Sequence, residues 1–339
     1  MKSSRHYPKS AKQRVRAMRH IEVISPSIAV QSMTVFDPDQ LAEAVGSSEL
    51  MHTQFTGGDF RGSLLAVEFT SLRLDTGCYS QSLISRGAFP AGRIVIGCLL
   101  DAKQSGCLNG HRFSRHDIVI FPEGAELDYL LPADTRWVAI QISRHELEST
   151  LQARLPTHGV KVIPGSVAAR FNFVSHLKGL LVHIENGAAS SCGLAPDDAA
   201  LFESLLFNDL CHLLEAEWQD PGARAHHSRN MGLLQQFERV VEKYPDSNPR
   251  ISAIARQLAI SPRTLQQTFK NYLGLSPKQY INCLRLNAIH QELVHETKNS
   301  ATVESIARMH GVAHLGRFSA HYRAQFGCNP SITLNKRPR

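Results

Sequence analysis

Long apolar segments are missing from this sequence of 339 residues. No apolar run approaches the roughly 18 residues that a membrane-spanning helix needs, and no short apolar stretch follows the basic amino terminus as it would in a secretory signal. We therefore expect a cytoplasmic protein with no membrane partner. The hydrophobic fraction of 42% is ordinary for a water-soluble chain, and the length allows two or three domains.

Paired cysteines are also missing. The chain has seven cysteines, an odd number, and none of them belongs to a Cys-x-x-Cys motif. They are Cys78, Cys98, Cys107, Cys192, Cys211, Cys283 and Cys328. This pattern favours reduced thiols in a cytosolic protein over a disulfide framework.

Signatures of catalysis and metal binding are absent from the first two thirds of the chain. No nucleophile-base constellation and no phosphate-binding loop occurs there, and His111 and His116 do not form the His-x-His pair of metal-binding cupins. We expect loop histidines, no catalytic residue, no metal and no cofactor, and hence no enzyme. Two alternatives stay open: a cupin-like enzyme with a DNA-targeting module, and a DNA-binding protein without an effector.

Charge is distributed unevenly along the chain, whose overall net charge is +7. Residues 1–20 hold seven basic residues and no acid, and from Asp246 onward 13 Lys and Arg face four Asp and Glu. Residues 21–245 hold 17 basic and 26 acidic residues, a net charge of −9. A basic carboxy-terminal region beside an acidic one is typical of nucleic-acid-binding proteins.

One pattern occurs twice in the last hundred residues. Ile254 and Ile306 are 52 residues apart, and four further pairs are each 53 apart. These pairs are Leu265 and Phe318, Phe269 and Tyr322, Gly274 and Gly327, and Pro277 and Pro330. A repeat with this period indicates a duplicated supersecondary unit, with one extra residue in the turn of the second copy.

Each copy reads as a helix-turn-helix. Apolar residues at 251, 254, 255 and 258 share one helical face. A small residue, Ala259 or Gly311, then permits a sharp turn where a positive φ is often needed. Ser261 followed by Pro262 predicts the start of a second helix. That helix buries the apolar residues 265 and 269 and turns outward the polar side chains Arg263, Thr264, Gln266, Gln267 and Lys270.

These hundred residues resemble the AraC/XylS family of bacterial transcription regulators. The matching positions are Ala255, Leu258, Ser261, Leu265, Phe269, Gly274, Ser276, Pro277, Tyr280, Leu284, Arg285, Leu286, Ala288, Ile306, Ala307, Gly311, Phe318, Ser319, Tyr322, Phe326, Gly327, Pro330 and Ser331. Val312 departs from the phenylalanine usual there. The resemblance implies an all-α domain with two helix-turn-helix units, recognition helices at Pro262–Tyr272 and His314–Gln325, and one linking helix, Pro277–His295.

The resemblance and the residue chemistry together nominate DNA contacts. For base readout we expect Arg263, Gln266, Gln267, His314, Gly316 and Arg317, because arginine and glutamine can bind guanine and adenine bidentately. Gly316 would allow close backbone approach. For phosphate contact we expect Thr264, Lys270 and Arg323. An exposed, solvated side chain is the alternative at each position. The implied partners are double-stranded DNA, a small-molecule effector, RNA polymerase and a second copy of the chain.

The region before this domain is expected to sense the effector. Residues 21 to about 143 read as β-rich, and their turn signals, among them Asp75-Thr76-Gly77, predict a sandwich or barrel. The expected strands include Leu64–Phe69, Arg93–Leu99, Asp117–Phe121 and Trp137–Ile142. The family resemblance implies a cupin-like jelly roll. The alternation of apolar residues places Val30, Phe69 and Leu99 in its pocket or its core, and does not distinguish between the two.

The remaining boundaries follow from composition and periodicity. Residues 144–218 are predicted to be helical, with helices at Val167–Ile184 and Asp197–Trp218 that form either a lid or a dimer interface. The effector-sensing and dimerisation domain would thus span 21–218. A polar linker at 219–230 would lead into the DNA-binding domain, 231–339, and residues 1–20 would be a flexible basic tail.

Overall fold

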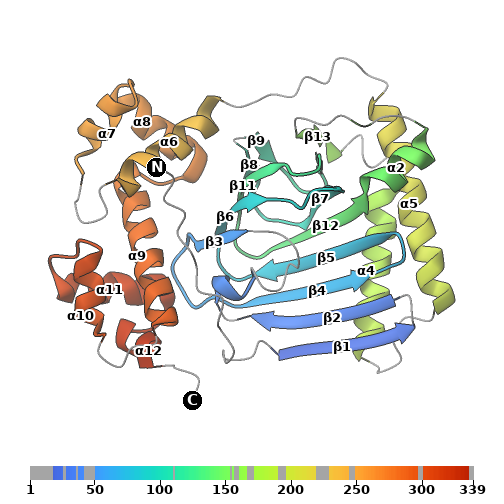
Figure 1. The fold of residues 1–339 in the computed structure, drawn as a ribbon, viewed down its shortest axis with the longest axis horizontal. Coiled ribbons are helices and arrows are strands. Elements are labelled where there is room, and N and C mark those ends of the chain that lie inside the picture. Colours follow the sequence, from blue (N-terminus) through green and yellow to red (C-terminus); the bar gives the residue numbers. More distant parts are fainter. Residues whose placement is uncertain are drawn as a thin grey trace.

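The computed structural model describes residues 18–25, 28–35, 37–41, 50–109, 111–152, 155, 160–165, 172–189, 196–218, 229–243, 249–296 and 301–335. Its elements form successive layers, which Figure 1 shows side by side. Two long helices cover one face of a large sheet, a smaller sheet lies on the other face of that sheet, and the carboxy-terminal helices pack beyond the smaller sheet.

The larger sheet is antiparallel and has eight strands. In spatial order they are β1 (Met18–Ser25), β2 (Ile28–Val35), β4 (Gly62–Glu68), β5 (Leu72–Tyr79), β12 (Thr135–Ser143), β7 (Arg93–Asp101), β10 (Ile118–Phe121) and β13 (Lys161–Ile163).

The smaller sheet is antiparallel and has five strands. In spatial order they are β3 (Met51–Gln54), β6 (Leu83–Ala88), β11 (Glu126–Leu131), β8 (Gly106–Leu108) and β9 (His111–Phe113). A 3-10 turn, η1 (Pro38–Gln40), follows β2. β3 is an edge strand, so one side of its backbone is left to bond with something outside the sheet.

Three apolar clusters hold these layers together. The cluster between the sheets contains Leu127 of β11 and Trp137 of β12. A second cluster joins the outer face of the larger sheet to three helices, α2 (Arg144–Leu151), α4 (Phe173–Ala189) and α5 (Pro196–Trp218). A third joins the outer face of the smaller sheet to the carboxy-terminal helices. Alternate residues of the central strands therefore face different cores, as a strand between two layers requires.

The carboxy-terminal helices are α6 (Arg229–Glu242), α7 (Ile251–Gln257), α8 (Pro262–Leu273), α9 (Pro277–His295), α10 (Val303–Met309), α11 (Leu315–Phe326) and α12 (Pro330–Asn335). α9 runs between the first helix pair, α7 and α8, and the second helix pair, α10 and α11. No helix in the described ranges is both long and apolar enough to cross a membrane.

Several sequence predictions agree with the structure. The four expected strands correspond to β4, β7, β10 and β12, and α5 spans 196–218, one residue more than predicted. α4 covers residues 173–184 of the helix expected at Val167–Ile184 and continues to Ala189, whereas residues 166–171 lie outside the described residues. The predicted linker lies mostly outside them as well, and so does most of the basic tail, although β1 starts within the tail at Met18.

The predicted turn at residues 75–77 is wrong, because these residues lie inside β5. The Asp75 carboxylate is buried and accepts hydrogen bonds from Arg73 at 3.0 Å and from Gln141 of β12 at 2.9 Å. At Gly77 an added Cβ would lie 2.7 Å from the side chain of Leu64. Tertiary partners therefore account for polar and small residues that in isolation favour a turn.

The predicted helical character of residues 144–218 is interrupted by β13, which pairs with β10 at the edge of the larger sheet. The three pocket candidates do not share one interior. Val30 and Phe69 pack in the cluster under α4 and α5, whereas Leu99 lies between the sheets. All three are core residues with less than 7% of their surface exposed.

Candidate nucleic-acid interface

The turn of the first helix pair forms as its sequence predicts. Ala259 has φ 53°, the left-handed conformation expected for the small residue at this position. The Ile260 amide donates back to the Ala255 carbonyl at 3.0 Å, which closes the turn. Ile254 and Ala255 are fully buried and anchor α7.

α8 begins and ends at well-defined caps. The Ser261 hydroxyl accepts a hydrogen bond from the Thr264 amide at 3.0 Å, and Pro262 occupies the first turn. Gly274 ends the helix with φ 70°, and its amide donates to the Lys270 carbonyl at 3.1 Å. These caps fix the start and the end of the helix.

The buried face of α8 determines which side chains point outward. Leu265 and Phe269 are fully buried, and the Phe269 ring lies 4.5 Å from the ring of Phe237 in α6 and 5.4 Å from that of Tyr280 in α9. The opposite face carries two cations, two amides and a hydroxyl. These exposed residues are Arg263, Thr264, Gln266, Gln267 and Lys270.

The second helix pair repeats this local geometry. Gly311 adopts φ 74°, and the Val312 amide donates to the Ala307 carbonyl at 3.0 Å. α11 ends at Gly327, which has φ 75°. Its buried face consists of Phe318, Tyr322 and Phe326. The duplicated pattern in the sequence therefore corresponds to two similar folded units.

A surface depression of about 470 Å³ lies at the amino-terminal end of α11. Its lining is rich in cations and small residues: Arg308, Ala313, His314, Leu315, Gly316 and Arg317. An added Cβ at Gly316 would meet no atom within 4 Å, so this position is open. Backbone N–H groups at a helix amino terminus favour anions, and the neighbouring arginines strengthen that preference.

α9 holds the two helix pairs on one continuous element. Its observed bounds, Pro277–His295, are those predicted from the sequence. A capping box formed by Ser276 and Gln279 fixes its start. Tyr280 and Ile281 pack with the first helix pair, and Ile289 and Leu293 pack with the second. Each helix pair is thereby packed on its own half of one helix.

The electrostatics of both faces favour a polyanion. Neither α8 nor α11 contains Asp or Glu. Two acids near α11 are already paired: Glu304 with Arg308 at 2.8 Å and Glu292 with His310 at 2.6 Å. The exposed cations of α8 and α11 therefore meet little local competition for phosphate.

All nine nominated residues are exposed on these two faces. Two of them make internal contacts that DNA would have to replace or share. The Gln267 amide donates to Asn271 at 2.8 Å, and the Thr264 hydroxyl lies 2.8 Å from that of Ser261. Arg308, which lines the depression, is not among the residues nominated from the sequence. Its place in the last turn of α10, three residues before the turn glycine Gly311, was the available signal.

The two histidines considered as metal ligands lie away from this interface. His111 is in β9, and His116 lies between β9 and β10. His116 accepts hydrogen bonds from Lys178 at 2.9 Å and from Arg115 at 3.2 Å. Burial and these two cations lower the pKa of His116. In the part of the chain that the structure describes, no three His, Cys, Asp or Glu side chains gather as metal ligands.

Comparison with known proteins identifies the carboxy-terminal helices. Residues 254–336 match a family described as "Helix-turn-helix domain". The "XylDLEGF operon transcriptional activator 3" of Pseudomonas putida is 38% identical over 104 residues, which are 30% of this chain and 31% of that protein. This is an AraC/XylS-type domain. The matched residues contain α8 to α12 and all of α7 except its first three residues.

A second relative aligns with a longer part of the chain. The "Probable thc operon regulatory protein" of Rhodococcus erythropolis is 27% identical over 216 residues, which are 61% of this chain and 63% of that protein. The chain thus covers less than two thirds of these relatives. A solved structure titled as a transcriptional regulator of the AraC type from Chromobacterium violaceum is 28% identical, covers 31% of this chain and 91% of that chain, and has a TM-score of 0.28.

Proposed function

We propose that this chain is a DNA-binding regulator of transcription in which both helix pairs act as helix-turn-helix units. The observation that carries the proposal is the pair of exposed, acid-free faces on α8 and α11, held by the single helix α9. α8 and α11 are the recognition helices and enter successive major grooves, about 34 Å apart along the DNA. The regulators of transcription among the relatives support this assignment.

The nominated residues divide into two roles. Side chains nearest the amino-terminal ends of the recognition helices read bases: Arg263, Gln266 and Gln267 in the first unit, and His314 and Arg317 in the second. Gly316, between the last two, lets the backbone approach the bases closely. The second unit adds Arg308, at the mouth of the depression, to the phosphate contacts. The other phosphate contacts are Thr264, Lys270 and Arg323.

The region of two sheets is the regulatory part of the proposal. The facing antiparallel sheets support a cupin-like jelly roll that binds a small-molecule effector. The sensing domain then runs from β1 to α5, which ends at Trp218, and the DNA-binding domain begins with α6 at Arg229, two residues before the start predicted from the sequence. The effector acts only if it binds one arrangement of the chain more tightly than another.

Dimerisation is assigned to α4 and α5. These helices pack on the larger sheet through one face, yet Val182 of α4 and Leu201 of α5 are more than half exposed. Exposed aliphatic side chains on two adjacent helices suit a contact with a second copy, and two copies would double the number of DNA subsites.

Substitution of the two arginines tests the DNA contacts. Arg263→Ala should relax base preference in one subsite, and Arg317→Ala in the other, each weakening binding by about 1–3 kcal/mol because one bidentate contact is lost. The measurement is selection of random duplexes by each purified variant. Arg239→Ala, an exposed arginine of α6, is the matched control and should select the wild-type sequence. Unchanged base preference in Arg317→Ala would remove this residue from the interface.

A further inference from the structure

The smaller sheet is joined to the first helix-turn-helix unit by a shared apolar core. Ile84 of β6 is buried in one cluster with Phe237, Phe269 and Tyr280, and Phe55, which follows β3, packs against the same cluster. The rings of Phe55 and Tyr280 lie 6.4 Å apart. An interface of this kind cannot open without exposing apolar surface to water.

The second helix-turn-helix unit contacts the sheets differently. Its apolar cluster contains only residues of α9 to α12 and their connecting turns, as far as the described residues show. Its contacts with the sheets are polar. The side-chain amide of Gln54 donates to the backbone carbonyl of Gln325 at 2.6 Å, and the side-chain amide of Gln325 donates to the backbone carbonyl of Gln54 at 3.0 Å. The Gly58 N–H also donates to the Gln325 backbone carbonyl, at 3.0 Å. Gln325 lies in the last turn of recognition helix α11.

The linking helix is held by the same edge strand. The Asn287 side chain of α9 accepts from the Gln54 N–H at 3.0 Å and donates to the Gln54 carbonyl at 2.9 Å. It thus bonds the free edge of β3 as a neighbouring strand would. Gln54 is 1% exposed, so these bonds are shielded from water.

A further polar contact lies beyond Asn287 along α9. His290 bonds Asp37, which follows β2, at 2.8 Å through one ring nitrogen, and Tyr322 of α11 at 2.6 Å through the other. The His290 ring also stacks on Phe326 at 4.2 Å. His290 therefore links Asp37, beside the larger sheet, to Tyr322 in the core of the second unit.

We propose that Asp37, Gln54 and the loop at residues 56–58 form a polar latch that sets the position of the second helix-turn-helix unit relative to the first. The first unit is fixed to the sheets by an apolar core, while the second is held by a small set of hydrogen bonds. These are positioning residues, since none lies on a recognition face. The latch controls the distance between the two DNA subsites, and this inference rests on the proposed function.

Because α9 is long, a small change in its bend moves the second helix-turn-helix unit appreciably. A helix of 19 residues is about 28 Å long, and long helices bend gently. A small bend near its centre displaces α11 along the DNA groove. The contacts at Asn287 and His290 hold the half of α9 that carries the second unit.

Gly57 provides a specific way to open the latch. A Cβ added there would overlap the Ala324 carbonyl oxygen in α11 and lie 3.3 Å from its carbonyl carbon. Because the overlapping atoms belong to the backbone of α11, no side-chain rotation can relieve the clash, and the loop at residues 56–58 and α11 must separate. Gly57 does not have a positive φ, so alanine adds no strain of that kind. Gly179→Ala in α4, where an added Cβ meets nothing within 4 Å, is the matched control.

The test measures spacing preference on the duplex that the wild-type full-length chain selects from random DNA. Fluorescence anisotropy compares this duplex with versions that have one base pair added or removed between the subsites. Wild type and Gly179→Ala should lose roughly tenfold in affinity on the altered duplexes, because a base contact is misplaced. Gly57→Ala and Asp37→Ala should bind the three duplexes with similar affinity and keep the same base preference within each subsite.

Three results separate the alternatives. If both variants retain the wild-type penalty for altered spacing, or lose affinity for all three duplexes equally, the latch is wrong. If the wild type selects no bipartite site, the proposed function fails first. Asp37→Ala removes a side chain at the rim of the latch, so it decides the question if Gly57→Ala does not fold.

Discussion

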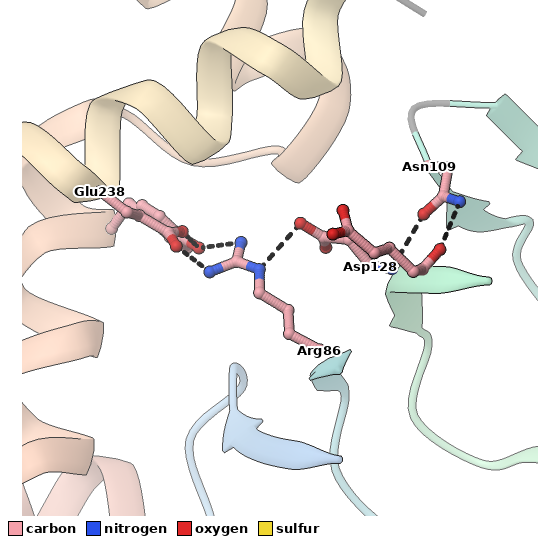
Figure 2. Close-up of polar contacts among 6 residues, drawn as sticks. Arg86, Asn109, Asp128 and Glu238 are labelled. Carbon is pink, nitrogen blue, oxygen red and sulfur yellow. Dashed lines mark hydrogen bonds and ion pairs between the residues drawn. The ribbon is translucent and has the colours of Figure 1, made fainter. Parts of the chain in front are cut away.

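Arg86→Ala should lower the free energy of unfolding by about 3–5 kcal/mol, because it leaves buried carboxylates without their cation. Arg86 of β6 lies between Asp128 of β11 and Glu238 of α6, as Figure 2 shows. Its guanidinium also donates to the Tyr280 hydroxyl at 3.0 Å, and that hydroxyl donates to Glu238. The group therefore joins the smaller sheet to α6 and α9.

The charges in this cluster depend on one another. Burial raises the pKa of Asp128, and the neighbouring Arg86 opposes that shift. Burial also raises the pKa of Tyr280 to about 12, so its hydroxyl stays protonated and can donate. Asn109 holds Asp128 from the far side through the Asp128 N–H, at 2.8 Å. Removing Arg86 leaves both carboxylates desolvated and unpaired.

Urea denaturation of the full-length chain measures the loss. Because the smaller sheet and the first helix pair share a core, we expect them to unfold in one transition whose midpoint falls in the variant. Lys103→Ala is the control: Lys103 pairs with Asp134 at 3.8 Å on the exposed surface, and such pairs contribute little. An Arg86→Ala midpoint equal to that of the control would show that the cluster does not stabilise the interface.

DNA affinity should fall about a thousandfold between roughly 50 and 200 mM salt if about six phosphates are neutralised. The recognition helices and Arg308 supply five cations, and further exposed basic residues of the neighbouring helices, among them Arg256 of α7 and Lys278 of α9, add to them. Each phosphate contact releases counterions, so the logarithm of the affinity declines linearly with the logarithm of the salt concentration. Fluorescence anisotropy with a labelled duplex gives the slope.

The slope can be assigned to individual residues. Lys270→Gln or Arg323→Gln should each reduce its magnitude by about one and weaken binding to all sequences alike. Arg239→Gln, on α6, should leave the slope unchanged. A wild-type slope near zero would mean that binding, if present, does not depend on phosphate contacts and that the exposed cations have another role.

The helices of the carboxy-terminal region could be predicted because their signals are local. Ser261, Pro262 and Gly274 act within one turn of the helix that they start or end. The bounds of α9 were implied by the family resemblance, and the structure has the same bounds. Gly311 and Ala259 likewise adopt the positive φ that a tight turn between helices requires. Short-range rules of capping and helical periodicity are sufficient for such elements.

The contacts between the two regions could not be predicted because the partners are distant in sequence. Gln54 and Asn287 are separated by 233 residues, and Arg86 and Glu238 by 152. Nothing near Gln54 in the sequence indicates that β3 is an edge strand whose backbone bonds a helix side chain. The turn predicted at residues 75–77 was wrong for the same reason, since the burial of these residues in β5 depends on strands formed elsewhere in the chain.

The central claim is that two recognition helices on one linking helix read DNA together. Selection of random duplexes by the purified full-length chain at low salt tests this most directly. We predict one enriched motif with two subsites whose centres lie about 10–10.5 base pairs apart, one helical turn. Enrichment of a single subsite, or of no sequence by a folded protein, would contradict it.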